Sequence, residues 1–407
     1  MNKYELAGEL ALSGELRPIL GEIPLAIACQ NAQRTLLVPE KNGHLASWVE
    51  GVKVIGMAHL AQLYPHLMKQ NPLSFVEQVD HISLAQNAYP DMQDVVGQPL
   101  AKRALEIAAS GGHNILMVGP PGTGKTMLAS RLPGILPRLT EQEAIKVAAV
   151  QSICPQAEQE LSGLTRPFRA PHHTASAAAL VGGGTVPKPG EVSLAHHGVL
   201  FLDELPEFDR KVLDVLREPM EAGEVTISRA QSKQTYPANF QLVAAMNPSP
   251  TGYYNDNRST PEQVLKYLNR LSGPFLDRID IQIEVARLPR GAWTHADAST
   301  ESTQQVRERV EACRQMQYQR QGKPNAELTS AEVREFCSMT NEDNEFLELA
   351  IEKLGMSTRA HHKMIKIART IADMAGNQSI EHHHLIEALS YRAMDRILRH
   401  LTESVAV

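Results

Sequence analysis

The stretch that decides the fold reads Gly119-Pro120-Pro121-Gly122-Thr123-Gly124-Lys125-Thr126, and it directly follows the apolar run Ile115-Leu116-Met117-Val118. A buried strand that runs through a glycine-rich turn into a helix is the arrangement that cradles nucleotide phosphates. The glycines let backbone N–H groups approach the phosphates, and the start of the helix adds its partial positive charge. Lys125 would place an ammonium group on the β- and γ-phosphates, and the Thr126 hydroxyl would bind Mg²⁺. The sequence therefore predicts a site for a nucleoside triphosphate.

Length and composition favour an ordinary globular protein with more than one domain. The chain has 407 residues, of which 43% are hydrophobic and 21% charged, and this suffices for two or three domains. No apolar run reaches the roughly 18 residues that cross a bilayer, and the N-terminus does not resemble a signal peptide. The four cysteines are scattered, which predicts neither a disulfide framework nor a zinc site. We therefore expect a cytoplasmic protein without membrane partners.

Three regions differ in their hydrophobic patterns. Residues 1–85 mix a helix-like stretch over 23–32 with a strand-like stretch over 35–39, which predicts a small α/β module. Residues 88–290 alternate helical and strand patterns, as a doubly wound parallel sheet requires. Residues 300–407 show helical periodicity with few strand signals, which predicts a helical domain. Its helical patterns cover residues 332–339, 344–354, 359–374 and 384–398.

Two more buried strands end in polar residues. The run 199–202 is followed by Asp203 and Glu204, and the run 242–246 is followed by Asn247. Such residues lie beside the phosphate loop in a parallel sheet of this class. Asp203 would hold Mg²⁺, and Glu204 would orient or deprotonate the attacking water. Asn247 would hydrogen-bond the γ-phosphate and the water, although an asparagine that merely starts a turn before Pro248 is an alternative.

Two arginines are candidates to neutralise charge on the triphosphate. Arg278 precedes a strand-like segment and could reach the γ-phosphate of a neighbouring subunit. A surface salt bridge with Asp277 or Asp280 explains the same spacing equally well. Arg359 begins a predicted helix of the C-terminal region and could touch the triphosphate from there.

Together these elements resemble the AAA+ ATPases, and within them the magnesium-chelatase-like ComM/YifB family. The resemblance runs from about Asp94 to the C-terminus and is carried by the segments 166–174, 182–184, 198–208, 216–221, 247–248 and 267–280. It implies a ring, typically a hexamer, with ATP and Mg²⁺ at each subunit interface. It also implies that Arg278 is an arginine finger, Asn247 a sensor 1 residue and Arg359 a sensor 2 residue.

Two locally basic segments could contact DNA. The formal net charge of −6 predicts no general attraction to nucleic acid, so contacts must come from local loops. The first segment, residues 224–237, is typical of a hairpin and carries Arg229 and Lys233. The second, residues 166–189, surrounds flexible glycines and carries Arg166, Arg169 and Lys188. Cations on both segments could bind phosphates, and ordinary solvated hairpins are the alternative interpretation.

A metal site on these segments is not expected. His172 and His173 are adjacent, and neighbouring residues of a strand point to opposite faces, so they would make a poor chelate. Many relatives have a cysteine cluster after the residue that corresponds to Asn247. This chain has none there, and hydroxyl and amide groups do not replace thiolates on Zn²⁺. We therefore predict no zinc.

Residues 1–70 resemble the latter half of a Lon-protease-like domain, so the chain is expected to begin partway through it. In Lon-type proteases a lysine lies in the helix before the strand that corresponds to residues 35–39. Pro24 stands near that lysine's place here. A serine nucleophile without its lysine base has no route to activation, and we expect no peptidase activity.

Three functions remain open at the level of the sequence. The first is an ATP-driven DNA motor, because the ComM type is associated with branch migration during integration of transforming DNA. The second is a chelatase subunit that drives Mg²⁺ insertion into a porphyrin with partner proteins, against which the Lon-like module argues. The third is a protein that binds ATP but assembles poorly.

Overall fold

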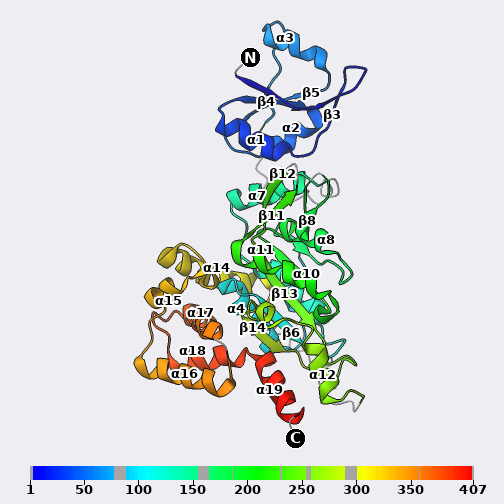
Figure 1. The fold of residues 1–407 in the computed structure, drawn as a ribbon. Helices are drawn as coiled ribbons and strands as arrows, with labels where there is room; N and C mark the ends of the chain where they lie inside the picture. The colour runs from blue at the N-terminus through cyan, green and yellow to red at the C-terminus, as the bar shows by residue number, and fades with distance from the viewer. Residues whose placement is uncertain are drawn as a thin grey trace.

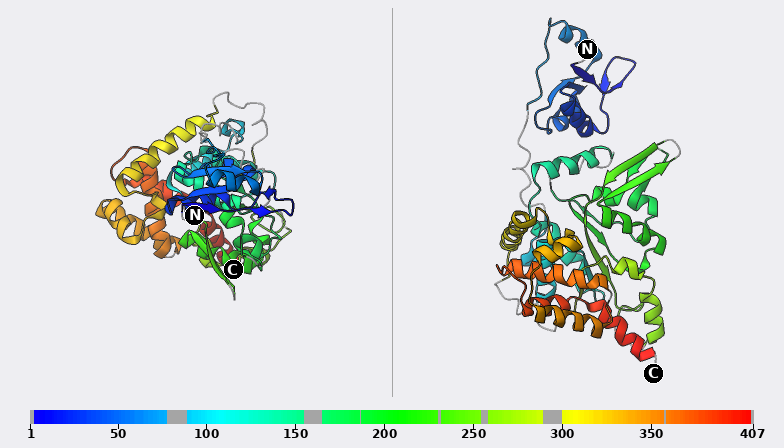
Figure 2. Two further views of the ribbon diagram at one scale, coloured as in Figure 1. Left: turned by 90° about the horizontal axis from the view of Figure 1, so that it is seen from above. Right: turned by 60° about the vertical axis from the view of Figure 1, so that its left-hand side comes forward.

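The computed structural model describes residues 3–77, 89–154, 165–185, 187–229, 232–253, 258–288, 300–356 and 358–405. The molecule is elongated, with a small N-terminal module at one end and a parallel-sheet core in the middle (Figure 1). The C-terminal helices pack against one side of the core (Figure 2). Among the described residues, no helix has the length and apolar character needed to cross a membrane.

The core is built on a five-stranded sheet in the order β14-β6-β13-β10-β7. These strands span Ile281–Glu284, Ile115–Val118, Gln241–Met246, Val199–Leu202 and Phe168–Arg169. All neighbouring strands pair in parallel, so the segments that follow them meet at one edge of the sheet. The predicted parallel α/β core is confirmed, and so is the helical C-terminal region.

Alternate residues of each central strand face two different hydrophobic clusters. Met117 and Phe201 belong to one cluster, while their neighbours Val118 and Leu202 belong to the other. Burial on both faces explains why these strands are continuous apolar runs. The first face is covered by α4 (Pro99–Gly111), α14 (Thr303–Gln321) and α17 (Thr358–Met374). The second is covered by elements that include α8 (Ala177–Val181), α10 (Arg210–Val215) and α12 (Pro261–Leu268).

Two hairpins lie on the same side of the molecule. The predicted hairpin is formed by β11 (Glu224–Arg229) and β12 (Ser232–Pro237), and a shorter one by β8 (Gly182–Gly183) and β9 (Lys188–Pro189). The Tyr236 hydroxyl donates to the Pro187 carbonyl oxygen at 2.8 Å and ties the two together. The other core helices are α5 (Lys125–Ala129), α6 (Leu132–Ile135), α7 (Glu141–Ser152), α9 (Glu191–Leu194), α11 (Arg217–Ala222) and α13 (Gly273–Leu276).

The C-terminal region contains α14 to α19, of which α14 was not predicted. Its buried face consists mostly of residues at helical spacing, but polar residues dominate the remaining faces and hide the pattern. The pattern over 384–398 is divided between two helices, because the chain turns at Tyr391 and Arg392. The remaining helices are α15 (Ser330–Phe336), α16 (Asn341–Leu354), α18 (His382–Ser390) and α19 (Ala393–Val405).

The N-terminal module has its own small sheet and core. The sheet order is β1-β4-β5, with strands Tyr4–Leu6, Thr35–Pro39 and Lys53–Met57. Its hydrophobic core extends to Ala148 on α7 of the parallel-sheet core. Around the sheet lie β2 (Glu9–Leu10), β3 (Leu16–Arg17), α1 (Glu22–Asn31), α2 (Glu40–Ala46) and α3 (Leu63–Leu67).

A charged cluster fastens α17 to the amino end of the sheet. Lys363 Nζ lies 2.7 Å from Asp280 Oδ1, and the backbone N–H of Asn114 donates to Asp280 Oδ2 at 3.1 Å. His113 Nε2 lies 2.8 Å from the Thr370 hydroxyl. Burial raises the pKa of Asp280, but Lys363 and His113 lower it more strongly, so the net pKa falls below its ordinary value. The carboxylate therefore holds the helical domain and the core together.

We expect Asp280→Asn to lower the free energy of unfolding by about 3 kcal/mol at pH 7, because it leaves Lys363 buried without a counter-charge. Urea unfolding would measure the change, with Asp277→Asn as the control. Because the pKa of Asp280 is depressed, its contribution is complete above about pH 4 and fades below it. Equal stability of the two variants at pH 7 would contradict this role.

Candidate functional site

The phosphate loop connects the carboxyl end of β6 to the start of α5. Gly122 and Gly124 have φ angles of 77° and 85°, a region that side chains other than glycine rarely adopt. A side chain at Gly119 would place its Cβ 2.3 Å from the Val285 carbonyl oxygen. The backbone path therefore requires glycine at these three positions, as in loops that approach a phosphate closely.

Lys125 lies inside the loop and contacts Asn247. Its Nζ donates to the carbonyl oxygens of Gly119 at 2.7 Å and Pro120 at 3.0 Å. It also lies 3.3 Å from Asn247 Oδ1, at the end of β13. Burial lowers the pKa of Lys125, while Asp203 and Glu204 act in the opposite direction. The ammonium group therefore lies within the phosphate loop. A bound phosphate would replace the carbonyl oxygens of Gly119 and Pro120 as its hydrogen-bond acceptor.

Thr126 and Asp203 form the predicted magnesium pair. The Thr126 hydroxyl donates to Asp203 Oδ2 at 2.8 Å, although 77 positions separate them in sequence. Hydroxyl and carboxylate oxygens are the ligands that Mg²⁺ prefers. Together with the backbone of Gly119–Gly124, this set of oxygen ligands fits a magnesium-bound triphosphate. The bond between the β- and γ-phosphates would then lie at the edge of the sheet.

Glu204 follows Asp203 and has an unusual backbone. Its φ of 52° lies in the left-handed region, which is uncommon for residues other than glycine and is often found at functional sites. Its side chain is 56% exposed, and its Oε2 lies 3.2 Å from Nδ1 of His173. The carboxylate therefore lies at the same edge as the phosphate loop, as a water-activating base requires.

Arg278 contacts an acidic residue of its own subunit. Its guanidinium donates to Glu221, at the end of α11, and the Arg278 side chain is only 11% exposed. The predicted alternative partners, Asp277 and Asp280, are not its ion-pair partners among the described residues. Action on a neighbouring subunit's phosphate would require Arg278 to leave Glu221.

Arg359 belongs to the first turn of α17, and its side chain is exposed. Lys363, one helical turn further along α17, pairs with Asp280 at the amino end of β14. The phosphate loop follows the opposite end of the neighbouring strand β6, and a four-residue strand spans roughly 13 Å. The Lys363 ammonium group is therefore near the end of the sheet opposite to the phosphate loop, and the contact of Arg359 with the triphosphate remains a prediction.

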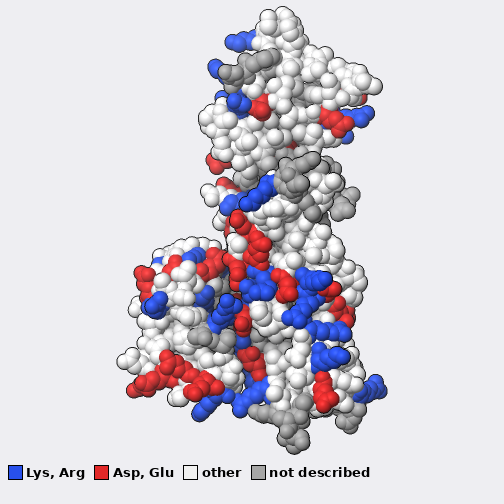
Figure 3. Space-filling view, viewed as in Figure 1, with Lys and Arg blue, Asp and Glu red and all other residues white. Residues whose placement is uncertain are grey.

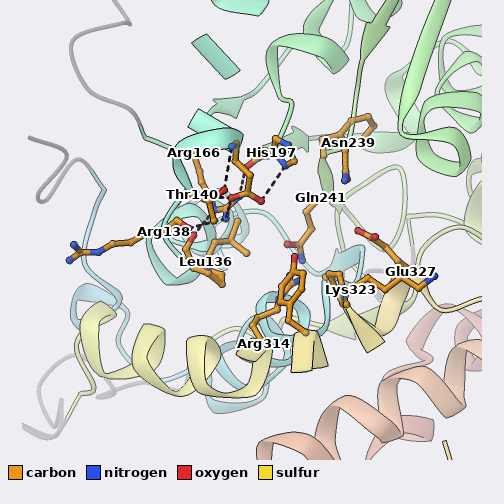
Figure 4. Close-up of a pocket in the computed structure, with 18 residues that line it drawn as sticks. Leu136, Arg138, Thr140, Arg166, His197, Asn239, Gln241, Arg314, Lys323 and Glu327 are labelled. Atoms are coloured by element: carbon orange, nitrogen blue, oxygen red, sulfur yellow. Dashed lines mark hydrogen bonds and ion pairs between the residues drawn. The ribbon is translucent and has the colours of Figure 1, made fainter. Parts of the chain in front are cut away.

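Arg166 is a structural residue, which corrects its prediction as a DNA contact. Its guanidinium donates to the carbonyl oxygens of Pro137 and His197 at 2.5 and 2.6 Å and lies 3.4 Å from Glu143. These groups line a cavity of about 290 Å³ at the amino end of the sheet (Figure 4). With 13% of its side chain exposed, Arg166 joins three segments of the core.

Arg169 also forms an ion pair within the fold, which argues against its prediction as a DNA contact. Its guanidinium forms two hydrogen bonds with the Glu191 carboxylate, at 2.7 and 3.0 Å. Such a bidentate pair satisfies the charge locally. The sequence analysis treated the basic residues of the segment 166–189 as possible DNA contacts. It did not account for Glu191, just beyond the segment, which neutralises Arg169.

Lys188 and Lys233 remain accessible on the two hairpins. Both side chains are exposed, and no acidic residue among those described forms an ion pair with either. Arg229 belongs to β11, but its side chain lies outside the described part of the structure. On the face drawn in Figure 3, basic and acidic side chains are interspersed over the core.

His173 and Glu221 were missed as site residues. His172 and His173 were considered as a metal site and as part of the basic segment 166–189, but not as partners of Glu204. Among the described residues no cluster of three metal-binding side chains occurs. His173 lies near Glu204, and Glu221 lies near Arg278, because tertiary contacts bring separate segments of the chain together. The histidine and glutamate residues alone carry no signal for those contacts.

Comparisons with known proteins agree with this geometry. The family model for the magnesium chelatase subunit ChlI matches residues 91–293, and that for the ChlI C-terminal region matches residues 300–392. The competence protein ComM of Haemophilus influenzae is 50% identical over 407 residues, 99% of this chain and 80% of that protein. The chain belongs to the ComM/YifB family of magnesium-chelatase-like AAA+ ATPases.

Other members of this family are less informative about function. The uncharacterized protein YifB of Escherichia coli is 49% identical and covers 98% of this chain and 79% of its own length. A 67 kDa subunit of magnesium chelatase from Chlorobaculum tepidum is 29% identical over 160 residues, which is 38% of this chain and 23% of that protein. The chelatase likeness is thus confined to a part of the chain, whereas the ComM likeness extends through the N-terminal module.

Proposed function

We propose that this protein hydrolyses ATP in a ring of identical subunits, a hexamer by analogy with its family, and uses the energy to move branched or single-stranded DNA. The observation that carries the proposal is the assembly of Lys125, Asp203, Glu204 and Asn247 at one edge of the sheet. The near full-length likeness to a protein named for competence favours DNA as the substrate.

Each residue of the site has one role in hydrolysis. Lys125 binds the β- and γ-phosphates, and Thr126 with Asp203 holds the magnesium ion, which neutralises phosphate charge. Glu204 accepts the proton of the attacking water, and Asn247 orients that water. The contact between Lys125 and Asn247 at 3.3 Å supports these roles, because two side chains that act on one phosphate must lie close together.

Arg278 completes the site from the neighbouring subunit. In a single subunit its charge is compensated by Glu221, whose side chain is 61% exposed. A solvent-exposed carboxylate is a weak partner, because water screens the pair. A γ-phosphate at a closed interface is a stronger one, so ring assembly would draw the guanidinium across. Arg359, which is exposed in the first turn of α17, would likewise act at an interface.

DNA would bind at the hairpins β8–β9 and β11–β12. Lys188 and Lys233 are exposed cations on hairpins that the Tyr236–Pro187 hydrogen bond holds together. Six copies around a ring would form a positive collar in an otherwise acidic protein. Phosphate contacts of this kind give affinity without sequence preference.

Service as a chelatase subunit is less well supported. Two relatives whose names describe a magnesium chelatase each align with 38% of this chain. The N-terminal module, which packs on α7 through Ala148, is shared with ComM instead.

A DNA-binding test follows from the two exposed lysines. We expect Lys188→Ala/Lys233→Ala to weaken binding of a four-way junction at least about tenfold in the presence of ATP, and to flatten the salt dependence of the affinity. Fluorescence anisotropy would measure both quantities. The control, Lys41→Ala/Lys353→Ala, removes the same charge from exposed positions outside the hairpins and should bind normally. Equal affinity of both double variants would contradict the assigned surface.

Mixed rings test the role of Arg278 across the interface. Glu204→Gln and Arg278→Ala subunits should each be inactive alone, because one lacks the base and the other the guanidinium. Mixing them creates interfaces in which an intact Glu204 faces an intact Arg278, and we expect part of the ATPase activity to return. Phosphate release measured against mixing ratio would detect it. Mixtures without activity would mean that Arg278 acts within its own subunit.

A further inference from the structure

The cavity beside Arg166 lies at the opposite end of the sheet from the phosphate loop. Its volume is about 290 Å³, and it is lined by the start of α7, the segments that lead into β10 and β13, and the second half of α14. In Figure 4, Arg166 and Thr140 lie on one side of it, Gln241 on the other and Arg314 below them. The volume approaches that of small-molecule sites, which begin at roughly 300 Å³. A compact organic ligand therefore fits.

Basic side chains outnumber acidic ones in the described lining of this cavity. The lining includes two acidic and four basic side chains: Glu143, Glu327, Arg138, Arg166, Arg314 and Lys323. Glu143 lies 3.4 Å from Arg166 and also accepts a hydrogen bond from the backbone N–H of Thr140 at 3.0 Å. Its negative charge is therefore already used within the fold.

The other basic residues differ in what balances their charge. Lys323 is paired with Glu332 at 2.8 Å, and Arg138 extends away from the cavity in Figure 4. Arg314 forms no ion pair with any described residue. Its Nε donates to the Ala109 carbonyl oxygen at 3.0 Å, but the terminal N–H groups of its guanidinium have no acceptor in the described part of the chain. Arg314 is thus the basic residue of the cavity that lacks a counter-charge.

Burial makes this lack of a counter-charge unfavourable. It lowers the pKa of Arg314, and the nearby Arg166 guanidinium acts in the same direction. Tyr318 and Glu327 oppose this shift. Burial also lowers the pKa of Arg166. Two desolvated guanidinium groups therefore repel each other across one cavity, and an anion bound there would offset the repulsion.

A phosphate monoester matches the chemistry of this lining. The planar fork of a guanidinium binds two oxygens of a phosphate at once. A phosphate monoester carries about −1.5 to −2 charge at pH 7, which suffices to offset the charge that Glu143 leaves on the two arginines. Phe240 and Tyr318 line the same cavity and offer aromatic surface to the organic part of a ligand.

We propose that this cavity is a binding site for a small phosphate monoester, whose phosphoryl group lies on Arg314 and whose organic part lies against Phe240 and Tyr318. The site is separate from the nucleotide edge and does not depend on the proposed function. The helix α7 also packs on the N-terminal module through Ala148. A ligand held between α7, the sheet and α14 would therefore stabilise the arrangement of these parts.

Calorimetric titration of the full chain with phenyl phosphate tests this inference, in the presence of saturating ADP and Mg²⁺ so that the phosphate loop is occupied. We expect a Kd below about 1 mM for wild type, and weaker binding of inorganic phosphate. Arg314→Gln should weaken binding of phenyl phosphate at least about tenfold, the effect of losing hydrogen bonds from a charged group.

The matched control is Arg307→Gln on the same helix. The Arg307 guanidinium also donates to a backbone carbonyl oxygen, that of Gly134 at 2.6 Å, but Arg307 does not belong to the lining of the cavity. This variant should bind phenyl phosphate like wild type. Phenol, which has the same ring without the phosphoryl group, should not bind, and this comparison needs no variant.

Several outcomes would overturn the inference. A wild-type protein that does not bind phenyl phosphate has no such site. Equal affinity of wild type and Arg314→Gln would exclude Arg314 as the anchor, and should that variant fail to fold, binding of phenol as tight as that of phenyl phosphate would exclude an anion site. Equal affinity for inorganic phosphate would exclude the aromatic contacts. Failure to bind ADP would instead remove the proposed nucleotide site, and the titrations with phenyl phosphate would still decide the cavity.

Discussion

The whole site depends on one constraint, the parallel alignment of β6, β10 and β13. Parallel strands direct their carboxyl ends to a single edge, and there the Thr126 hydroxyl meets Asp203 at 2.8 Å and Lys125 meets Asn247 at 3.3 Å. None of these pairs is close in sequence. Burial of both faces of the sheet fixes the alignment, because alternate residues of each strand belong to different hydrophobic clusters. The chemistry of the edge is therefore a consequence of the packing of the two faces.

The same sheet separates the helical domain from the nucleotide. Asp280 holds α17 at the amino end of β14, while the phosphate loop lies at the carboxyl end of β6. Arg278 forms an ion pair with Glu221 of its own subunit. That Arg278 and Arg359 act on the triphosphate of a neighbouring subunit is part of the proposed function.

The sequence predicted those features that follow from local patterns. The phosphate loop, the strands before Asp203 and Asn247 and the hairpin over 224–237 each carry their own signal in apolar runs, glycines or turn residues. Features that depend on distant partners were not predictable. Arg166 and Arg169 were assigned to DNA because they are basic, but Glu143 and Glu191 neutralise them in the fold. The helix α14 was missed because its narrow buried face is surrounded by polar residues.

The most direct test is calorimetric binding of ATP with Mg²⁺ to the purified protein, compared with Lys125→Ala. We expect micromolar or tighter affinity for wild type and a loss of at least about 3 kcal/mol in the variant, because the ammonium group contacts the β- and γ-phosphates. Thermal unfolding without nucleotide should be similar for both proteins. Failure of the wild-type protein to bind ATP with Mg²⁺, or equal binding by both proteins, would contradict the assignment of this edge as a nucleotide site.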